Sequence, residues 1–184
     1  MKAVLISIQP KWCELIANGK KTIEVRKTKP KLETPFKVYI YCTKDKERSF
    51  FPPLKKPVFK PMNYVENVRG NGKVIGEFVC DKIYEIGYDY FYPVGYEVSM
   101  GEISLKELYE KSCLSFNQID NYLNMELGYG WHISNLVIYD KPRELQEFSV
   151  PKEYKTSTQQ KQRIYKSGLK VPQSWCYVES EVAE

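Results

Sequence analysis

The chain opens with an apolar block followed by a one-sided amphipathic stretch. Residues 3–8 (AVLISI) form a short, β-branched apolar run, which predicts a strand. Pro10 suits the first turn of a helix, and residues 12–16 (WCELI) carry apolar side chains three and four positions apart. Gly19 can adopt the left-handed conformation that ends many helices. A strand followed by a short helix is therefore predicted.

The same patterns recur along the rest of the chain. Ser104 with Glu107, and Ser115 with Gln118, have the spacing of a capping box, which predicts helices at 104–112 and 115–127. Gly70, Asn71 and Gly72 predict a tight turn that leads into a strand. Strands are predicted at 21–27, 36–43, 73–80, 81–93, 131–140 and 172–179.

This order of elements is typical of an α+β domain built on a small, largely antiparallel β-barrel with short flanking helices. The 184 residues suit a single domain, 1–184. A proline-rich stretch at about 44–70 breaks the pattern, because proline cannot donate to a sheet ladder. We interpret this stretch as an excursion of the chain that packs on the body.

Charge is distributed unevenly along the chain. The net charge is +5, but residues 1–60 hold 15 Lys and Arg against 5 Asp and Glu, whereas residues 61–184 hold 13 against 18. Such segregation indicates an anionic partner, with nucleic acid the leading candidate, although lysine-rich surfaces also serve solubility. No apolar run is long enough to cross a bilayer, and the N-terminus lacks the pattern of a signal peptide. We therefore expect a cytoplasmic protein with no membrane partner.

The metal-binding side chains are sparse. Five cysteines are scattered without a CxxC pair, and His132 is the single histidine. These residues cannot complete a zinc site at the usual spacing. We expect reduced thiols, no metal and no cofactor.

The stretch at residues 19–27 (GKKTIEVRK) holds the best candidate for function. Strand side chains alternate between faces, so Ile23 and Val25 are expected to point to the core, with Glu24 and Arg26 side by side on the other face. Lys21 is expected at the rim, with a buried stem and an exposed ammonium group. Taken alone, this pattern is also that of an ordinary surface salt bridge.

A family resemblance favours a functional site over an ordinary salt bridge. Residues 7–27 (SIQPKWCELIANGKKTIEVRK) resemble the opening of the ASCH domain, whose signature is a helix followed by G-x-K-x-x-E-x-R. The chain supplies this signature as Gly19, Lys21, Glu24 and Arg26. The resemblance continues through GKVIGEFVCDKI, GWHISNLVIYDKP and PQSWCYVE, in the manner of phage-type members, and leaves out the excursion.

The resemblance implies a PUA-like β-barrel with a cleft between the first helix and the barrel wall. RNA or a nucleotide-like ligand is the implied occupant. Lys21 would then neutralise phosphate, Glu24 would accept hydrogen bonds from base amino groups, and Arg26 would contact phosphate or a base edge. The other expected ligand-binding residues are Thr22, Trp12, Trp131 and His132. Of the tryptophans, Trp131 is expected to be exposed, because it follows a flexible GYG.

Relatives also raise the possibility of an enzyme. One branch of small bacterial members removes the acetyl group from N4-acetylcytidine, but Glu24 stands here at the position of its nucleophilic threonine, so that activity is not expected. Another relative implies metal-independent RNA cleavage. The alternatives are therefore binding without turnover, or a hydrolase of RNA or of a modified nucleoside amide that uses Lys21, Glu24 and His132. A protein partner for the proline-rich stretch is a third option.

Overall fold

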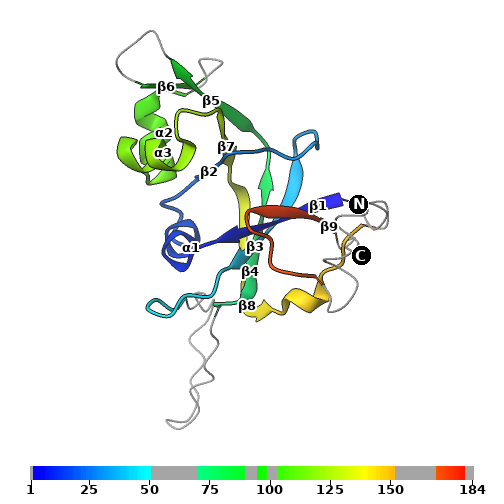
Figure 1. The fold of residues 1–184 in the computed structure, drawn as a ribbon. Coiled ribbons are helices and arrows are strands. Elements are labelled where there is room, and N and C mark those ends of the chain that lie inside the picture. Colours follow the sequence, from blue (N-terminus) through cyan, green and yellow to red (C-terminus); the bar gives the residue numbers. More distant parts are fainter. Residues whose placement is uncertain (1, 51–69, 90–94, 99–102, 152–168, 181–184) are drawn as a thin grey trace. The chain divides into compact units, whose positions relative to one another are not determined.

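The structure is a computed structural model that describes residues 2–50, 70–89, 95–98, 103–151 and 169–180 (Figure 1). The chain divides into two compact units. The first comprises Met1–Ala17, Lys37–Phe78 and Leu136–Glu184, and the second comprises Asn18–Phe36 and Val79–Asn135. Most of the predicted excursion at 44–70 lies outside the described residues.

The first unit is built on a five-stranded sheet with the order β8-β4-β3-β1-β9. Its strands are β1 (Lys2–Ile8), β3 (Phe36–Cys42), β4 (Lys73–Cys80), β8 (Ser134–Arg143) and β9 (Trp175–Glu179). Helix α1 (Pro10–Ala17) follows β1, as predicted, and a short 3-10 helix, η1 (Leu145–Glu147), follows β8. Strand β1 runs parallel to β3 and antiparallel to β9. The core of this unit holds Ala3, Leu5, Tyr39, Tyr41, Val74, Leu145, Phe148 and Val178.

The second unit is built on a four-stranded sheet with the order β2-β7-β5-β6. Its strands are β2 (Ile23–Arg26), β5 (Ile83–Asp89), β6 (Gly95–Val98) and β7 (Gly128–His132), and its helices are α2 (Leu105–Ser112) and α3 (Phe116–Leu123). Figure 1 shows the two helices together beside these strands. One core joins the sheet to the helices, through Ile23, Val25, Tyr84, Ile86, Tyr96, Ile103, Leu108, Ile119 and Leu123.

Both predicted capping boxes are confirmed. The side chain of Ser104 accepts a hydrogen bond from the backbone of Glu107, and the Glu107 side chain accepts one from the backbone of Ser104. Ser115 and Gln118 form the same reciprocal pair at α3. These bonds satisfy backbone donors that the first turn of a helix leaves without partners.

The predicted strand at 131–140 is divided in two. The chain leaves β7 at Ile133 and enters β8, and the two strands belong to different sheets. The preceding GYG is strand, not a flexible link. A Cβ atom at Gly128 would come within 2.6 Å of Leu123, and one at Gly130 within 3.0 Å of Ile23. Glycine at these two positions therefore lets β7 pack closely against α3 and β2.

The predicted barrel is wrong. Over the described residues the two sheets are open ladders, with β8 and β9 at the edges of one and β2 and β6 at the edges of the other. The physical reason lies at Ile133, where the chain passes from one sheet to the other instead of extending a single ladder. The α+β class and the mainly antiparallel pairing are confirmed. Among the described helices, none has the length and apolar character needed to span a membrane.

Candidate functional site

Strand β2 is buried on both faces, which is unusual for a segment with two charged residues in four. All of Ile23, Glu24, Val25 and Arg26 are buried. Ile23 and Val25 belong to the core shared with α2 and α3. Because side chains alternate along a strand, Glu24 and Arg26 project from the opposite face.

Lys21 is almost fully buried, with 2% of its surface exposed. Its Nζ donates to the backbone carbonyl of Ser112 at 2.6 Å and lies 3.2 Å from Oε2 of Glu24. The prediction of an exposed ammonium group is therefore wrong. Lys21 precedes β2, so strand alternation does not set its direction, and the carbonyls at the C-terminus of α2 favour a cation at that position.

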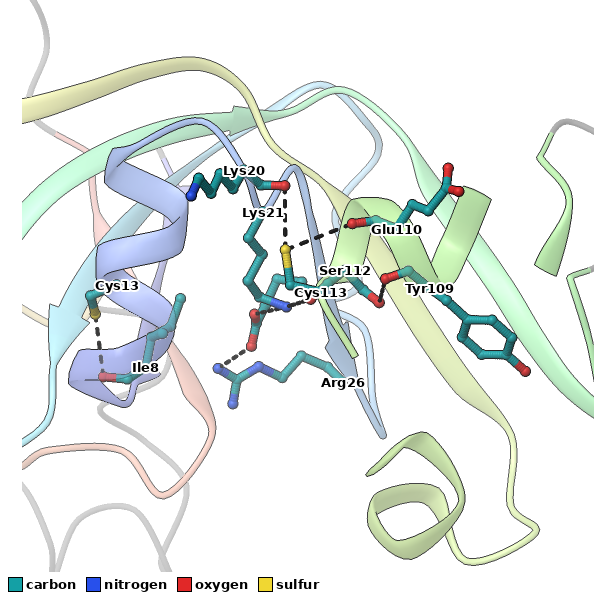
Figure 2. A network of polar contacts seen from close by, with 10 residues as sticks. Ile8, Cys13, Lys20, Lys21, Arg26, Tyr109, Glu110, Ser112 and Cys113 are labelled. Carbon is teal, nitrogen blue, oxygen red and sulfur yellow. Dashed lines mark hydrogen bonds and ion pairs between the residues drawn. The ribbon is translucent and has the colours of Figure 1, made fainter. Parts of the chain in front are cut away.

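Glu24 links two cations. Its Oε1 lies 2.9 Å from Nη2 of Arg26, while its Oε2 faces Lys21. The predicted side-by-side placement of Glu24 and Arg26 is confirmed. Figure 2 shows Lys21 and Arg26 converging beside Ser112 and Cys113, at the end of α2. We call Lys21, Glu24 and Arg26 the signature cluster.

Backbone bonds anchor the signature cluster to its surroundings. The amide of Thr22 donates to the carbonyl of Lys111, and the carbonyl of Thr22 accepts from the amide of Ile133, both at 2.8 Å. The thiol of Cys113 points to the carbonyl of Lys20 at 3.4 Å (Figure 2). These contacts hold the segment before β2 against the end of α2 and against Ile133, the residue that follows β7. The Thr22 side chain, a predicted ligand-binding group, is half-buried there.

Trp131 lies beside the signature cluster but is not exposed. It is directly opposite Glu24 in the β2–β7 ladder, so its side chain is on the same face of the sheet. None of its surface is exposed, and its ring meets that of Phe36 edge to face at 5.9 Å. The expectation of an exposed stacking surface is wrong, because the GYG that precedes it is ordered strand. Trp12 is half-buried, under the ammonium group of Lys11, and belongs to the first unit.

His132 is on the other face of the sheet from Glu24. It is directly opposite Ile23 in the β2–β7 ladder, and its Nδ1 lies 2.7 Å from Oδ1 of Asp81. Partial burial raises the pKa of Asp81, but hydrogen bonds from His132, from its own backbone and from Ser134 outweigh burial and leave the pKa lowered. The structure thus brings Lys21 and Glu24 together but does not bring His132 to them.

Sequence reasoning missed Ser112, because a backbone carbonyl acceptor has no signature in residue type. A cavity of about 560 Å³ in the first unit was also unforeseen. It is lined by Tyr41, Thr43, Lys44, Asn71, Gly72, Lys73, Glu144, Leu145, Gln146 and Val171, none of which is a predicted site residue. Across the described ranges, no group of three or more His, Cys, Asp or Glu side chains is placed to hold a metal ion.

Comparison with known proteins decides the family. The family model described as the ASCH domain matches residues 6–155. The chain is a member of the ASCH domain family. ASCH domains are a PUA-like family with a proposed RNA-binding activity. The match ends before β9, the strand that pairs with β1 in this chain.

Two solved structures support the ASCH fold. Both are mutants of ZmASCH from Zymomonas mobilis, one tyrosine-to-phenylalanine and the other serine-to-alanine. The first is 18% identical, covers 97% of this chain and 91% of its own, and has a TM-score of 0.52. The second is 17% identical, covers 96% of this chain and 88% of its own, and also has a TM-score of 0.52. No curated protein matches the chain. The family match does not distinguish a phage-type subgroup, which stays a prediction.

Proposed function

We propose that this ASCH domain binds single-stranded RNA, or a nucleotide-like part of it, through the signature cluster. The observation that carries the proposal is the position of Glu24 between Lys21 and Arg26, with all three side chains at most 9% exposed. Taking charges out of water costs several kcal/mol per ion, and pairing them often does not recover this penalty, so apolar side chains at these positions would serve stability as well or better.

The chemistry of the signature cluster fits a nucleotide. Two cations and one carboxylate give the three side chains a net positive charge, which favours phosphate. The planar guanidinium of Arg26 can contact a phosphate or the edge of a guanine with two parallel bonds. The carboxylate of Glu24 can accept hydrogen bonds from a base amino group. Each of these contacts would replace part of the internal pairing as the ligand enters.

Binding is favoured over turnover because of the sheet register. A catalytic set of Lys21, Glu24 and His132 needs the three side chains around one substrate, yet Ile23 and His132 are directly opposite, as are Glu24 and Trp131. His132 and Glu24 therefore project from opposite faces. Incubation of the protein with RNA and with acylated nucleosides, beside a His132→Gln variant, tests the hydrolase alternative. Consumption that depends on His132 would establish it.

The binding test compares the wild type with a replacement of all three charged residues of the signature cluster. Lys21→Met, Glu24→Gln and Arg26→Met together remove all three charges while keeping similar side-chain size, which is far less disruptive than leaving one buried charge alone. We expect the wild type to bind fluorescein-labelled single-stranded RNA, with affinity that falls as salt rises. The triple variant, checked for folding by circular dichroism, should bind about tenfold more weakly or worse. A folded variant with wild-type affinity and salt dependence would refute the proposal.

A further inference from the structure

A second group of side chains lies where the chain leaves β2. Nζ of Lys29 lies 2.7 Å from Oε1 of Glu85 and 4.9 Å from the centroid of the Tyr129 ring. The Lys29 and Glu85 side chains are 43% and 41% exposed, and Tyr129 is half-buried. We call Lys29, Tyr129 and Glu85 the Tyr129 platform.

The Tyr129 platform continues the signature cluster across the sheet. Arg26 is directly opposite Tyr129 in the β2–β7 ladder, and Tyr129 is directly opposite Glu85 in the β5–β7 ladder. Directly opposed residues share a face, so Arg26, Tyr129 and Glu85 form one row across three strands. Glu24 is two residues before Arg26 and is on this face too. A buried charged group and a half-buried aromatic ring are thus immediate neighbours.

The surrounding charge favours a polyanion. Residues 26–31 (RKTKPK) hold four cations and no acidic residue. Lys27 repeats the arrangement of Lys29, since its Nζ lies 5.8 Å from the centroid of the Tyr122 ring and 3.8 Å from Oε2 of Glu126. The hydrogen bond to Glu85 raises the pKa of Lys29 above its ordinary value. Lysines interleaved with tyrosines are the surface on which single strands bind, by phosphate contact and base stacking.

A solvent-exposed ion pair beside a tyrosine is common and is by itself worth about 0–1 kcal/mol. That low value matters here, because Lys29 can exchange Glu85 for a phosphate at little cost. From these relationships we infer that the Tyr129 platform is the next contact for single-stranded RNA held at the signature cluster. Tyr129 stacks on a base, and Lys29 exchanges Glu85 for the adjoining phosphate. The carboxylate of Glu85 repels the phosphates of the RNA and so weakens binding. This inference rests on the proposed function.

Substitutions at Glu85 and Lys29 should change RNA affinity in opposite directions. Glu85→Gln removes a negative charge and frees Lys29, so single-stranded RNA should bind about threefold more tightly or better. Lys29→Gln should weaken binding and reduce the salt slope by about one. Tyr129→Leu should weaken binding about fivefold or more, whereas Tyr129→Phe keeps an aromatic face and should bind like the wild type. A merely destabilised protein would not show gains and losses together.

A matched ion pair in the first unit supplies the control. Lys73 and Glu144 are also 2.7 Å apart and partly exposed, so Lys73→Gln and Glu144→Gln repeat the charge changes far along the chain from β2. Equal effects at both pairs would show general surface electrostatics and overturn the inference. Wild-type affinity in all the platform variants would also overturn the inference. If the signature-cluster variant still lost affinity for RNA, the proposed function would stand. A wild type that binds no RNA overturns both.

Discussion

Oε1 of Glu24 lies 2.9 Å from Nη2 of Arg26, and each of these side chains is only 9% exposed. An ion pair on the surface is solvated and screened, whereas one this buried has lost most of its contact with water. Removing one partner then leaves the other charge without compensation, which costs more than the pair itself contributes. The signature cluster is therefore part of the fold as well as the candidate binding group.

Glu24→Gln should lower the free energy of unfolding by about 3–5 kcal/mol, because it leaves the buried cations of Lys21 and Arg26 facing a neutral amide. Urea unfolding followed by circular dichroism measures this change. Glu85→Gln is the control, since the same substitution at an exposed pair should cost about 0–1 kcal/mol. Equal small losses in both variants would contradict the buried pairing of Glu24.

Trp131→Ala should be destabilising by about 3–5 kcal/mol, as large-to-small changes at fully buried aromatic positions are. The substitution leaves a cavity beside Phe36, whose ring meets the indole at 5.9 Å. Leu127→Ala, at a side chain that is 47% exposed, should change stability by less than about 0.5 kcal/mol. Thermal unfolding of the two variants separates these cases, and a small effect at Trp131 would mean that the indole is exposed after all.

The five cysteines should differ in reactivity. Burial raises the pKa of Cys80 to about 12 and that of Cys176 to about 12, so both thiols stay protonated at neutral pH. Cys13 and Cys42 are buried, whereas Cys113 is partly exposed at the end of α2. Iodoacetamide at about pH 8 should therefore modify Cys113 first. Mass spectrometry locates the adduct, and Cys113→Ser should abolish the fastest step of labelling. Early labelling of Cys80 would contradict the structure.

Asp81 should make stability depend on pH in the acid range. Partial burial raises its pKa, but hydrogen bonds from His132, its backbone and Ser134 lower it further, so the folded-state pKa lies below the ordinary 3.8. The fold thus favours the carboxylate. This contribution is complete above the ordinary value and is lost as pH falls through the lower, folded-state value.

The measurement compares the wild type with Asp81→Asn in urea, between about pH 6 and about pH 2. The wild type should be more stable at the upper end, and the difference should shrink towards the lower end. Ser134→Ala removes one of the hydrogen bonds to the Asp81 carboxylate. Its stability difference from the wild type should also shrink as pH falls, but by less than for Asp81→Asn. A difference that is constant over the whole range would show that Asp81 has the same pKa in both states.

Local rules account for what could be read from the sequence. The capping boxes at Ser104 and Ser115 depend on side chains three residues away, and both form as predicted. The pairing of Glu24 with Arg26 depends only on strand alternation, and it is also present. The signature spacing led to the ASCH family, which the match over residues 6–155 confirms.

Long-range contacts account for what could not be read. The buried Lys21 ammonium group is satisfied by the carbonyl of Ser112, and no sequence feature near Lys21 predicts that partner. Trp131 follows glycines that look flexible in sequence, yet Gly128 and Gly130 are strand residues packed against Leu123 and Ile23. The closed barrel failed for the same reason: alternation predicts strands but does not say which strands share a sheet.

Nζ of Lys21 and the carbonyl of Ser112 are separated by 91 positions along the chain. The candidate RNA-binding group therefore exists only after a large loop has closed, and loop closure of this kind slows folding. A fragment that stops before α2 would keep every letter of the G-x-K-x-x-E-x-R motif and still lose the acceptor that orients its lysine. A shortened form of this protein, or a graft of the motif onto another scaffold, would therefore have to include the end of α2.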